Sequence, residues 1–139
     1  MLVREIMTKK VVTIDSNCTV FNAVEKYFNK KIGCLVVTNK TRCVGIFTER
    51  DLIERVIYLR KDPLKTKIGD IMSSDVKTIK PLNTLEDALK VMKKYRIKKL
   101  PVISDDNIVG IITITDIAYA RPDLTNRFIE SWIKPRWID

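Results

Sequence analysis

The sequence predicts an α/β (α+β) fold in which two β-α-β-β-α repeats pack pseudo-symmetrically around a central cleft. Two observations support this prediction. First, the chain repeats itself at an offset of 65 residues, which aligns Met7 with Met72 and ends with Asp51 aligned with Asp116. Second, each copy alternates short β-rich runs with stretches of helical apolar spacing. The chain is therefore two copies of one unit.

Each copy is predicted to begin with a short strand, at 11–14 in the first and 76–79 in the second. A helix follows, capped by Thr19 or Thr84, and Asp87 three residues after Thr84 has the spacing of a capping box. The apolar positions of these two helices are Val20, Ala23, Val24 and Phe28, and Leu85, Ala88, Leu89 and Met92.

Two β-rich runs come next in each copy, CLVVT and CVGIF in the first and LPVIS and IVGII in the second, joined by polar turns. A second helix is predicted to start at Thr48 or Thr113. A sheet of about three strands with two helices leaves one face poorly covered, so the copies are expected to pack together. The seam between them is a natural concave binding site.

The expected domains are 1–60 and 66–121, followed by a C-terminal helical tail at 122–139. The tail shows helical apolar spacing at Leu124, Phe128, Ile129, Trp132 and Ile133, with Pro135 ending the helix and a second tryptophan at Trp137. We expect it to pack on the module or on a dimer mate. Contact with a separate effector protein is the alternative.

Composition excludes several classes of function. The chain has no histidine, so Ser-His-Asp and Cys-His catalysis are excluded, and Cys18, Cys34 and Cys43 form no zinc-binding CxxC pair. We expect reduced cysteines, no metal, no catalytic cofactor and a cytoplasmic protein. No apolar run approaches the length of a membrane span, and no Walker-type loop is present. The chain is not expected to be an enzyme.

The motif GxxTxxD occurs twice, as GIFTERD at 45–51 and GIITITD at 110–116. In each copy a strand ends, glycine permits close approach to the backbone, and threonine opens a helix with aspartate one turn in. One interpretation is a capping box that satisfies free N–H groups. The other is a nucleotide site, since a helix start favours phosphate and a carboxylate accepts from ribose hydroxyls.

Taken in order, and twice, these elements resemble the CBS-domain pair, or Bateman module, of proteins such as the gamma subunit of AMP-activated protein kinase and inosine monophosphate dehydrogenase. The resemblance covers about residues 1–120. Its motifs are VREIMT and IGDIMS, TIDSNCTVFNAV and TIKPLNTLEDAL, IKKLPVI, and both copies of GxxTxxD. It implies a homodimeric regulatory sensor that binds AMP, ADP, ATP or S-adenosylmethionine between the repeats and signals to an effector protein.

The resemblance also implies two sites, each built from both repeats. In site A, Asp51 would bind ribose, Thr48 and Arg50 would lie near phosphate, and the second repeat would add Lys77, Ile97 and Lys98. In site B, Asp116 would bind ribose, with phosphate near Lys99, Thr113 and Thr115 and adenine near Val12, Ile32 and Gly33. Thr115 stands where the first copy has Arg50, which indicates unequal sites.

Alternatives remain open for several of these residues and for the function. Arg50 and Lys98 can be solvated surface charges, and Val12, Ile32 and Ile97 can be core residues. The net charge of +9 attracts anions, including nucleic acid, so a DNA- or RNA-binding protein is the alternative function. Against it, the basic residues are spread along the chain and no nucleic-acid-binding signature is visible.

Overall fold

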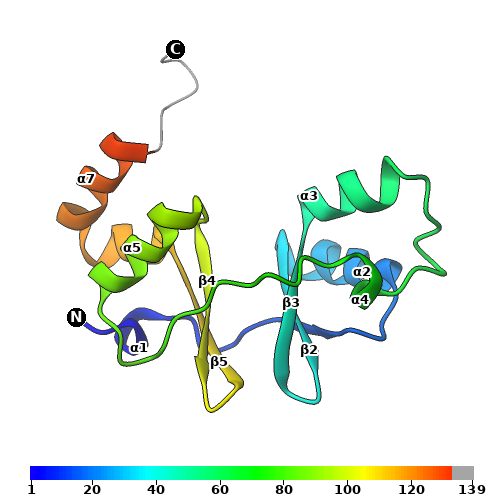
Figure 1. Ribbon diagram of the computed structural model, residues 1–139, viewed down its shortest axis with the longest axis horizontal. Coiled ribbons are helices and arrows are strands. Elements are labelled where there is room, and N and C mark those ends of the chain that lie inside the picture. Colours follow the sequence, from blue (N-terminus) through cyan, green and yellow to red (C-terminus); the bar gives the residue numbers. More distant parts are fainter. Residues whose placement is uncertain (133–139) are drawn as a thin grey trace. The chain divides into compact units, whose positions relative to one another are not determined.

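The computed structural model describes residues 1–132, with side chains described up to residue 127, and divides the chain into two compact units (Figure 1). The first-repeat unit is Val12–Val76. The second-repeat unit combines Met1–Val11 with the chain from Lys77 onward. The expected domains, 1–60 and 66–121, mark the sequence repeats, whereas each compact unit takes in the opening segment of the other repeat.

The first-repeat unit has the predicted β-α-β-β-α order, and its second helix changes to a π-helix. Strand β1 pairs with β2 in parallel, and β2 pairs with β3 in an antiparallel hairpin. The core combines strand and helix side chains, among them Ile14, Val20, Leu35, Phe47 and Val56. The elements are β1 (Thr13–Asp15), α2 (Val20–Lys30), β2 (Cys34–Asn39), β3 (Arg42–Thr48), α3 (Glu49–Asp51), η1 (Leu52–Ile57) and α4 (Ile68–Ile71).

The second-repeat unit repeats the helix, hairpin and second helix, with a further helix after them. Strands β4 and β5 form an antiparallel hairpin. The core includes Val3, Leu85, Met92, Leu100 and Ile117. The elements are α1 (Val3–Ile6), α5 (Leu85–Tyr95), β4 (Lys99–Ser104), β5 (Asn107–Thr113), α6 (Ile114–Ala120) and α7 (Pro122–Trp132). Together the two units confirm the predicted α/β fold.

The first strand predicted for the second repeat, at 76–79, does not form as a strand. It is reduced to one parallel bridge between Ile79 and Val102, whereas the first repeat forms the three-residue strand β1.

Two prolines account for this difference, because proline has no N–H to donate to a ladder. Pro81 stands at the position of Ser16, whose N–H donates to the Thr38 carbonyl at 2.9 Å. Pro101 lies in β4 at the position that Val36 occupies in β2. Bonds at both ends of the expected ladder are therefore lost.

Reciprocal caps start helices α2 and α5. Thr84 N–H donates to Asp87 Oδ2 at 3.0 Å, and Asp87 N–H donates back to Thr84 Oγ1 at 3.1 Å, which confirms the predicted capping box. The hydrogen bond from the Thr84 N–H is the largest cause that lowers the pKa of Asp87. In α2, Thr19 N–H donates to Asn22 Oδ1 at 3.0 Å and Asn22 N–H donates to Thr19 Oγ1 at 3.2 Å. Asn22 therefore completes the same capping box with an uncharged amide in place of a carboxylate.

The apolar face predicted for α5 is buried, whereas the prediction for α2 is wrong at Phe28, whose exposed fraction is 83%. Eight residues after Val20, Phe28 lies about 80° around the helix from that buried side chain. It therefore falls outside the core-facing side of α2.

The opening segment of each repeat packs within the unit that holds the other repeat. Thr8, just after α1, forms an antiparallel bridge with Ile111 in β5. In the same way Ser73, just after α4, forms a bridge with Ile46 in β3. Each opening segment thus lies along the strand that leads into a GxxTxxD helix.

The glycine of each motif permits this approach. A Cβ on Gly45 would collide with the side chain of Met72 and lie 2.9 Å from the Ser73 carbonyl oxygen. A Cβ on Gly110 would lie 2.9 Å from Met7 Cγ. The predicted close approach to both glycines is therefore confirmed, and the approaching groups belong to the chain itself.

Helix α7 packs against α5 and α6 in the second-repeat unit. Leu124 lies against the core and Thr125 is buried. The predicted side-chain arrangement at Phe128, Ile129 and Trp132, and all predictions for Ile133, Pro135 and Trp137, lie outside the described residues. Within residues 1–132, no helix combines the length and the apolar character needed to cross a bilayer.

Candidate functional site

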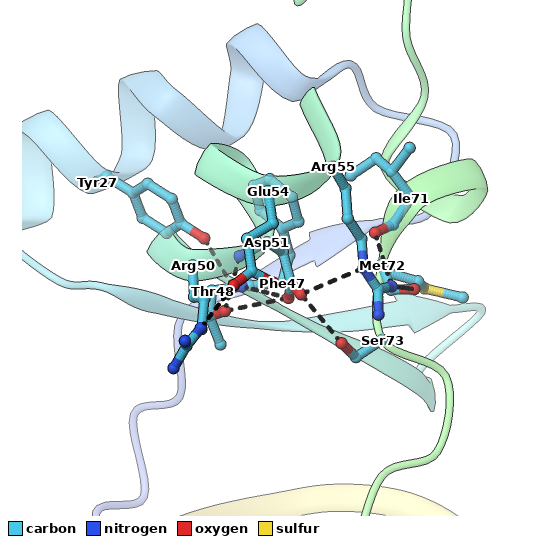
Figure 2. Close-up of polar contacts among 10 residues, drawn as sticks. All are labelled: Tyr27, Phe47, Thr48, Arg50, Asp51, Glu54, Arg55, Ile71, Met72 and Ser73. Carbon is cyan, nitrogen blue, oxygen red and sulfur yellow. Dashed lines mark hydrogen bonds and ion pairs between the residues drawn. The ribbon is translucent and has the colours of Figure 1, made fainter. Parts of the chain in front are cut away.

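The GxxTxxD motif of the first repeat forms a reciprocal cap where β3 passes into α3 (Figure 2). Thr48 has an extended backbone, and its N–H donates to Asp51 Oδ2 at 2.9 Å. Asp51 N–H donates to Thr48 Oγ1 at 3.2 Å, and the Thr48 hydroxyl lies 3.1 Å from Oδ2. The capping interpretation is therefore confirmed, and the cap fixes the position of the carboxylate.

The other oxygen of Asp51 contacts groups that sequence analysis did not identify. The Ser73 hydroxyl donates to Asp51 Oδ1 at 3.1 Å, and Arg55 Nε lies 3.7 Å from the same oxygen. Arg55 Nη1 also donates to the carbonyls of Ile71 and Met72, at 3.2 and 2.9 Å (Figure 2). The carboxylate is thus tied to the segment that leads into the second repeat, and its side chain is 10% exposed.

The sequence contains partial indications that Ser73 and Arg55 are partners of Asp51. Ser73 ends the opening motif IGDIMS, where the first copy has the hydroxyl of Thr8. Arg55 lies four residues after Asp51, which is the spacing of helical ion pairs. Without the bridge between β3 and the opening segment, however, nothing indicated that Ser73 and Asp51 meet.

The second repeat forms the same cap with fewer partners. Thr113 N–H donates to Asp116 Oδ2 at 3.0 Å, and Asp116 N–H donates to Thr113 Oγ1 at 3.1 Å. Asp116 is partly buried, and Ala120 stands where the first repeat has Arg55. Chemically, this carboxylate is fixed in place while retaining acceptor capacity.

Tyr27 supports the first-repeat motif from α2. Its hydroxyl donates to the Phe47 carbonyl at 2.6 Å, and the rings of the two residues are parallel with centroids 6.0 Å apart. Burial, with smaller contributions from the charges of Cys34, Asp51 and Glu49, raises the pKa of Tyr27 well above its usual range. Tyr27 is therefore a neutral hydrogen-bond donor that holds the end of β3.

The remaining predicted residues of the first repeat divide into surface and core positions. The Arg50 side chain is 83% exposed and pairs with Glu54 at 2.8 Å, and this hydrogen bond raises the pKa of Arg50. Val12 and Ile32 pack against the core of the unit. The Gly33 carbonyl accepts from the Glu49 N–H at 3.1 Å.

Ile32 and Gly33 also line a surface pocket of about 540 Å³ in the first-repeat unit. Its wall is mostly apolar and comes from α2 on one side and from α3 and η1 on the other. Two residues of predicted site B therefore border a concave surface.

In the second-repeat unit the predicted lysines lie at or near the surface. Lys98 and Lys99 are exposed, as is Thr115. Lys77 Nζ lies 4.4 Å from the centroid of the Tyr95 ring. Ile97 packs against the core.

The structure thus divides each predicted site between the two units. Site A has Thr48, Arg50 and Asp51 in one unit and Lys77, Ile97 and Lys98 in the other. Site B is divided in the same way, with Val12, Ile32 and Gly33 on the first-repeat side and Lys99, Thr113, Thr115 and Asp116 on the second. The assembly of each set into one site stays a prediction. Among the side chains that the structure describes, up to residue 127, no three or more potential metal-ligating groups cluster together.

Comparison with known proteins finds matches along both repeats. The family model described as "CBS domain" matches residues 3–58 and 68–123. The CBS domain-containing protein YhcV of Bacillus subtilis is 29% identical over 116 residues, which are 84% of this chain and 82% of YhcV.

Two solved structures are similar in fold. The CBS domain pair of protein MJ0100, in complex with 5-methylthioadenosine and S-adenosyl-L-methionine, has a TM-score of 0.77 and 27% identity, covering 89% of this chain and 98% of that one. The hexameric CBS-CP12 protein from bloom-forming cyanobacteria has a TM-score of 0.75 and 28% identity, covering 99% and 78%.

Replacing Asp51 by alanine is expected to lower the free energy of unfolding by about 2 kcal/mol or more, because the cap is lost and the partners of Oδ1 lose their acceptor. Asp116→Ala should cost about 1 kcal/mol, the value of a cap alone. Chemical denaturation measures both. As a control, Asp51→Asn should keep the cap, as Asn22 does in α2, and lose only the contribution of the Oδ1 partners, so its loss should be smaller than that of Asp51→Ala. Equal losses for the two alanine variants would contradict a stabilising role for Ser73 and Arg55.

Proposed function

The chain belongs to the CBS-domain family, and we propose that it is a regulatory module that binds AMP, ADP, ATP or a related adenosyl ligand such as S-adenosylmethionine. The observation that carries the proposal is the duplicated GxxTxxD cap, which fixes a carboxylate beside a threonine hydroxyl in each repeat. The adenosyl compounds bound by the MJ0100 pair support this ligand class.

The chemistry of the caps suits a nucleoside. A ribose offers two neighbouring hydroxyl donors, and an ionised carboxylate is an acceptor that can take both. Asp51 in site A and Asp116 in site B would take these bonds, with residues of both repeats completing each site. The exposed Lys98 and Lys99 would attract phosphate groups, and the net charge of +9 favours anions in general.

We propose that the module is not itself an enzyme and has no catalytic cofactor. The sequence has no histidine, and the two fixed carboxylates are each engaged by a helix cap. The module would then act by favouring one arrangement of its parts when ligand binds, which requires different affinities for the two states. An effector protein would receive that signal, and the cysteines, which form no disulfide in the described residues, suit a cytoplasmic protein.

A thermal-shift panel tests the ligand class. We expect at least one of adenosine, 5-methylthioadenosine, S-adenosylmethionine, AMP, ADP and ATP to raise the melting temperature, since a ligand at about 100 times its Kd adds about 2.7 kcal/mol. The double variant Asp51→Asn, Asp116→Asn should lose this shift while keeping its caps, because an amide accepts from the threonine N–H as Asn22 does.

A short DNA duplex serves as the comparison in the same panel. The net charge favours nucleic acid as a second candidate ligand. A shift with DNA alone, lost steeply as salt rises and unchanged in the double variant, would contradict the adenosyl proposal and leave both motifs as helix caps.

We also propose that the module forms a homodimer through the outer face of the first-repeat helices. This face, formed by α2 and η1 and the turn after them, exposes Phe28, Ile53, Ile57, Tyr58 and Leu59 at 83, 59, 61, 80 and 56%. In the second repeat, α7 packs against the corresponding helices. An exposed apolar group of this size is typical of an interaction surface, and the hexameric CBS-CP12 protein is a similar chain that assembles with copies of itself.

The repeat supplies the substitutions that test this interface. Phe28 aligns with Lys93 and Ile53 with Ala118, so Phe28→Lys, Ile53→Ala gives the first repeat the side chains of the second at these two positions. We expect this double variant to be monomeric by sedimentation velocity at concentrations where the native chain is dimeric. Tyr119→Glu, which gives the 88% exposed Tyr119 the identity of its counterpart Glu54, is the control and should remain dimeric. A monomeric native chain, or a dimeric double variant, would contradict the proposal.

A further inference from the structure

The two motif carboxylates differ in how much acceptor capacity remains for a ligand. Asp51 accepts from Thr48 on Oδ2 and from Ser73 on Oδ1, with Arg55 3.7 Å from Oδ1. A carboxylate has about four lone-pair positions. Nearly all of these positions on Asp51 face a donor: the Thr48 N–H, the Thr48 hydroxyl, the Ser73 hydroxyl or Arg55. Only 10% of the Asp51 side chain is exposed.

Asp116 has the same cap without the other donors. Its Oδ2 accepts from Thr113 N–H at 3.0 Å, and among the described residues no further donor is bonded to its side chain. One sequence difference accounts for the missing guanidinium, because Ala120 stands where the first repeat has Arg55. Thr8 is bridged through its backbone to Ile111 just as Ser73 is to Ile46, but in the part of the chain that the structure describes its hydroxyl is not bonded to Asp116.

The donors around Asp51 are held by local structure. The helix that carries Arg55 is the π-helix η1, whereas α6 in the second repeat is α-helical. Arg55 is fixed at its far end by the carbonyls of Ile71 and Met72. A ribose at Asp51 must therefore compete with contacts that tie residues 71–73 to the motif.

We propose that the two adenosyl sites fill in order, Asp116 first, and that Ser73 and Arg55 restrain Asp51 from accepting ribose hydroxyls. This inference rests on the proposed function, in which each motif aspartate binds ribose. Filling of the Asp51 site displaces the hydroxyl of Ser73 or the guanidinium of Arg55 and so loosens the segment between the repeats. The second binding event is then the one that changes the conformation of the chain.

Isothermal titration of the full chain with 5-methylthioadenosine, and separately with AMP, tests the order of filling. We expect a tight and a weak event, with Asp116→Asn weakening the tight one about tenfold or more. Asp51→Asn should remove the weak event. Both substitutions keep an acceptor for the cap, as Asn22 does in α2, and a cooperative thermal unfolding transition of each variant verifies the fold.

The restraint itself is tested by Ser73→Ala combined with Arg55→Ala. In this variant the affinity of the weaker binding event should rise about fivefold or more, because donors that compete with the ribose hydroxyls are removed. Thr8→Ala is the matched control, because Thr8 stands at the position of Ser73 in the other repeat, and it should change neither event.

The possible results distinguish a wrong order of filling from a wrong adenosyl function. Binding of neither probe to any variant would contradict the adenosyl function. Binding in which Asp51→Asn removes the tight event, or in which the two events are equal, would overturn the order of filling. An unchanged weak event in the Ser73→Ala, Arg55→Ala variant would overturn the restraint.

Discussion

Reciprocal hydrogen bonds between a threonine and an aspartate join the last strand of each repeat to its second helix. In the first repeat Thr48 and Asp51 exchange them at 2.9 and 3.2 Å, and in the second Thr113 and Asp116 do so at 3.0 and 3.1 Å. The bonds satisfy backbone donors that a helix start leaves free. They also hold a carboxylate in one position, and this fixed acceptor is what makes each motif a candidate ribose site.

The opening segment of each repeat brings further groups to the same strand. Because Gly45 has no side chain, Met72 and Ser73 can lie against β3, and this brings the Ser73 hydroxyl to Asp51. Gly110 admits Met7 in the same way, but in the described residues the hydroxyl of Thr8, which follows Met7, is not bonded to Asp116, and Ala120 replaces Arg55. Duplication therefore preserved the backbone frame while the surroundings of the two carboxylates diverged.

Local chemistry in the sequence was enough to predict much of the fold. The offset of 65 residues, the threonine caps and the polar turns predict both hairpins and the helix starts. The strand expected at 76–79 is missing because of Pro81 and Pro101 together. Their effect can be predicted only when one knows which carbonyls would accept from an N–H at these two positions. The pairing of Arg55 with Asp51 has the local i,i+4 spacing of a helical ion pair. The contact of Ser73 with Asp51 depends on the packing of the opening segment, a long-range feature that spacing along the chain does not encode.

Removing the ribose hydroxyls from the ligand tests whether the motif carboxylates bind them. Adenosine and 2′,3′-dideoxyadenosine differ only in the two ribose hydroxyls. Isothermal titration of the native chain with each compound gives the two affinities for comparison. We expect the dideoxy compound to bind about tenfold more weakly or worse, since a carboxylate then loses its donors. Equal affinities would contradict ribose binding by the aspartates and assign them to helix capping alone.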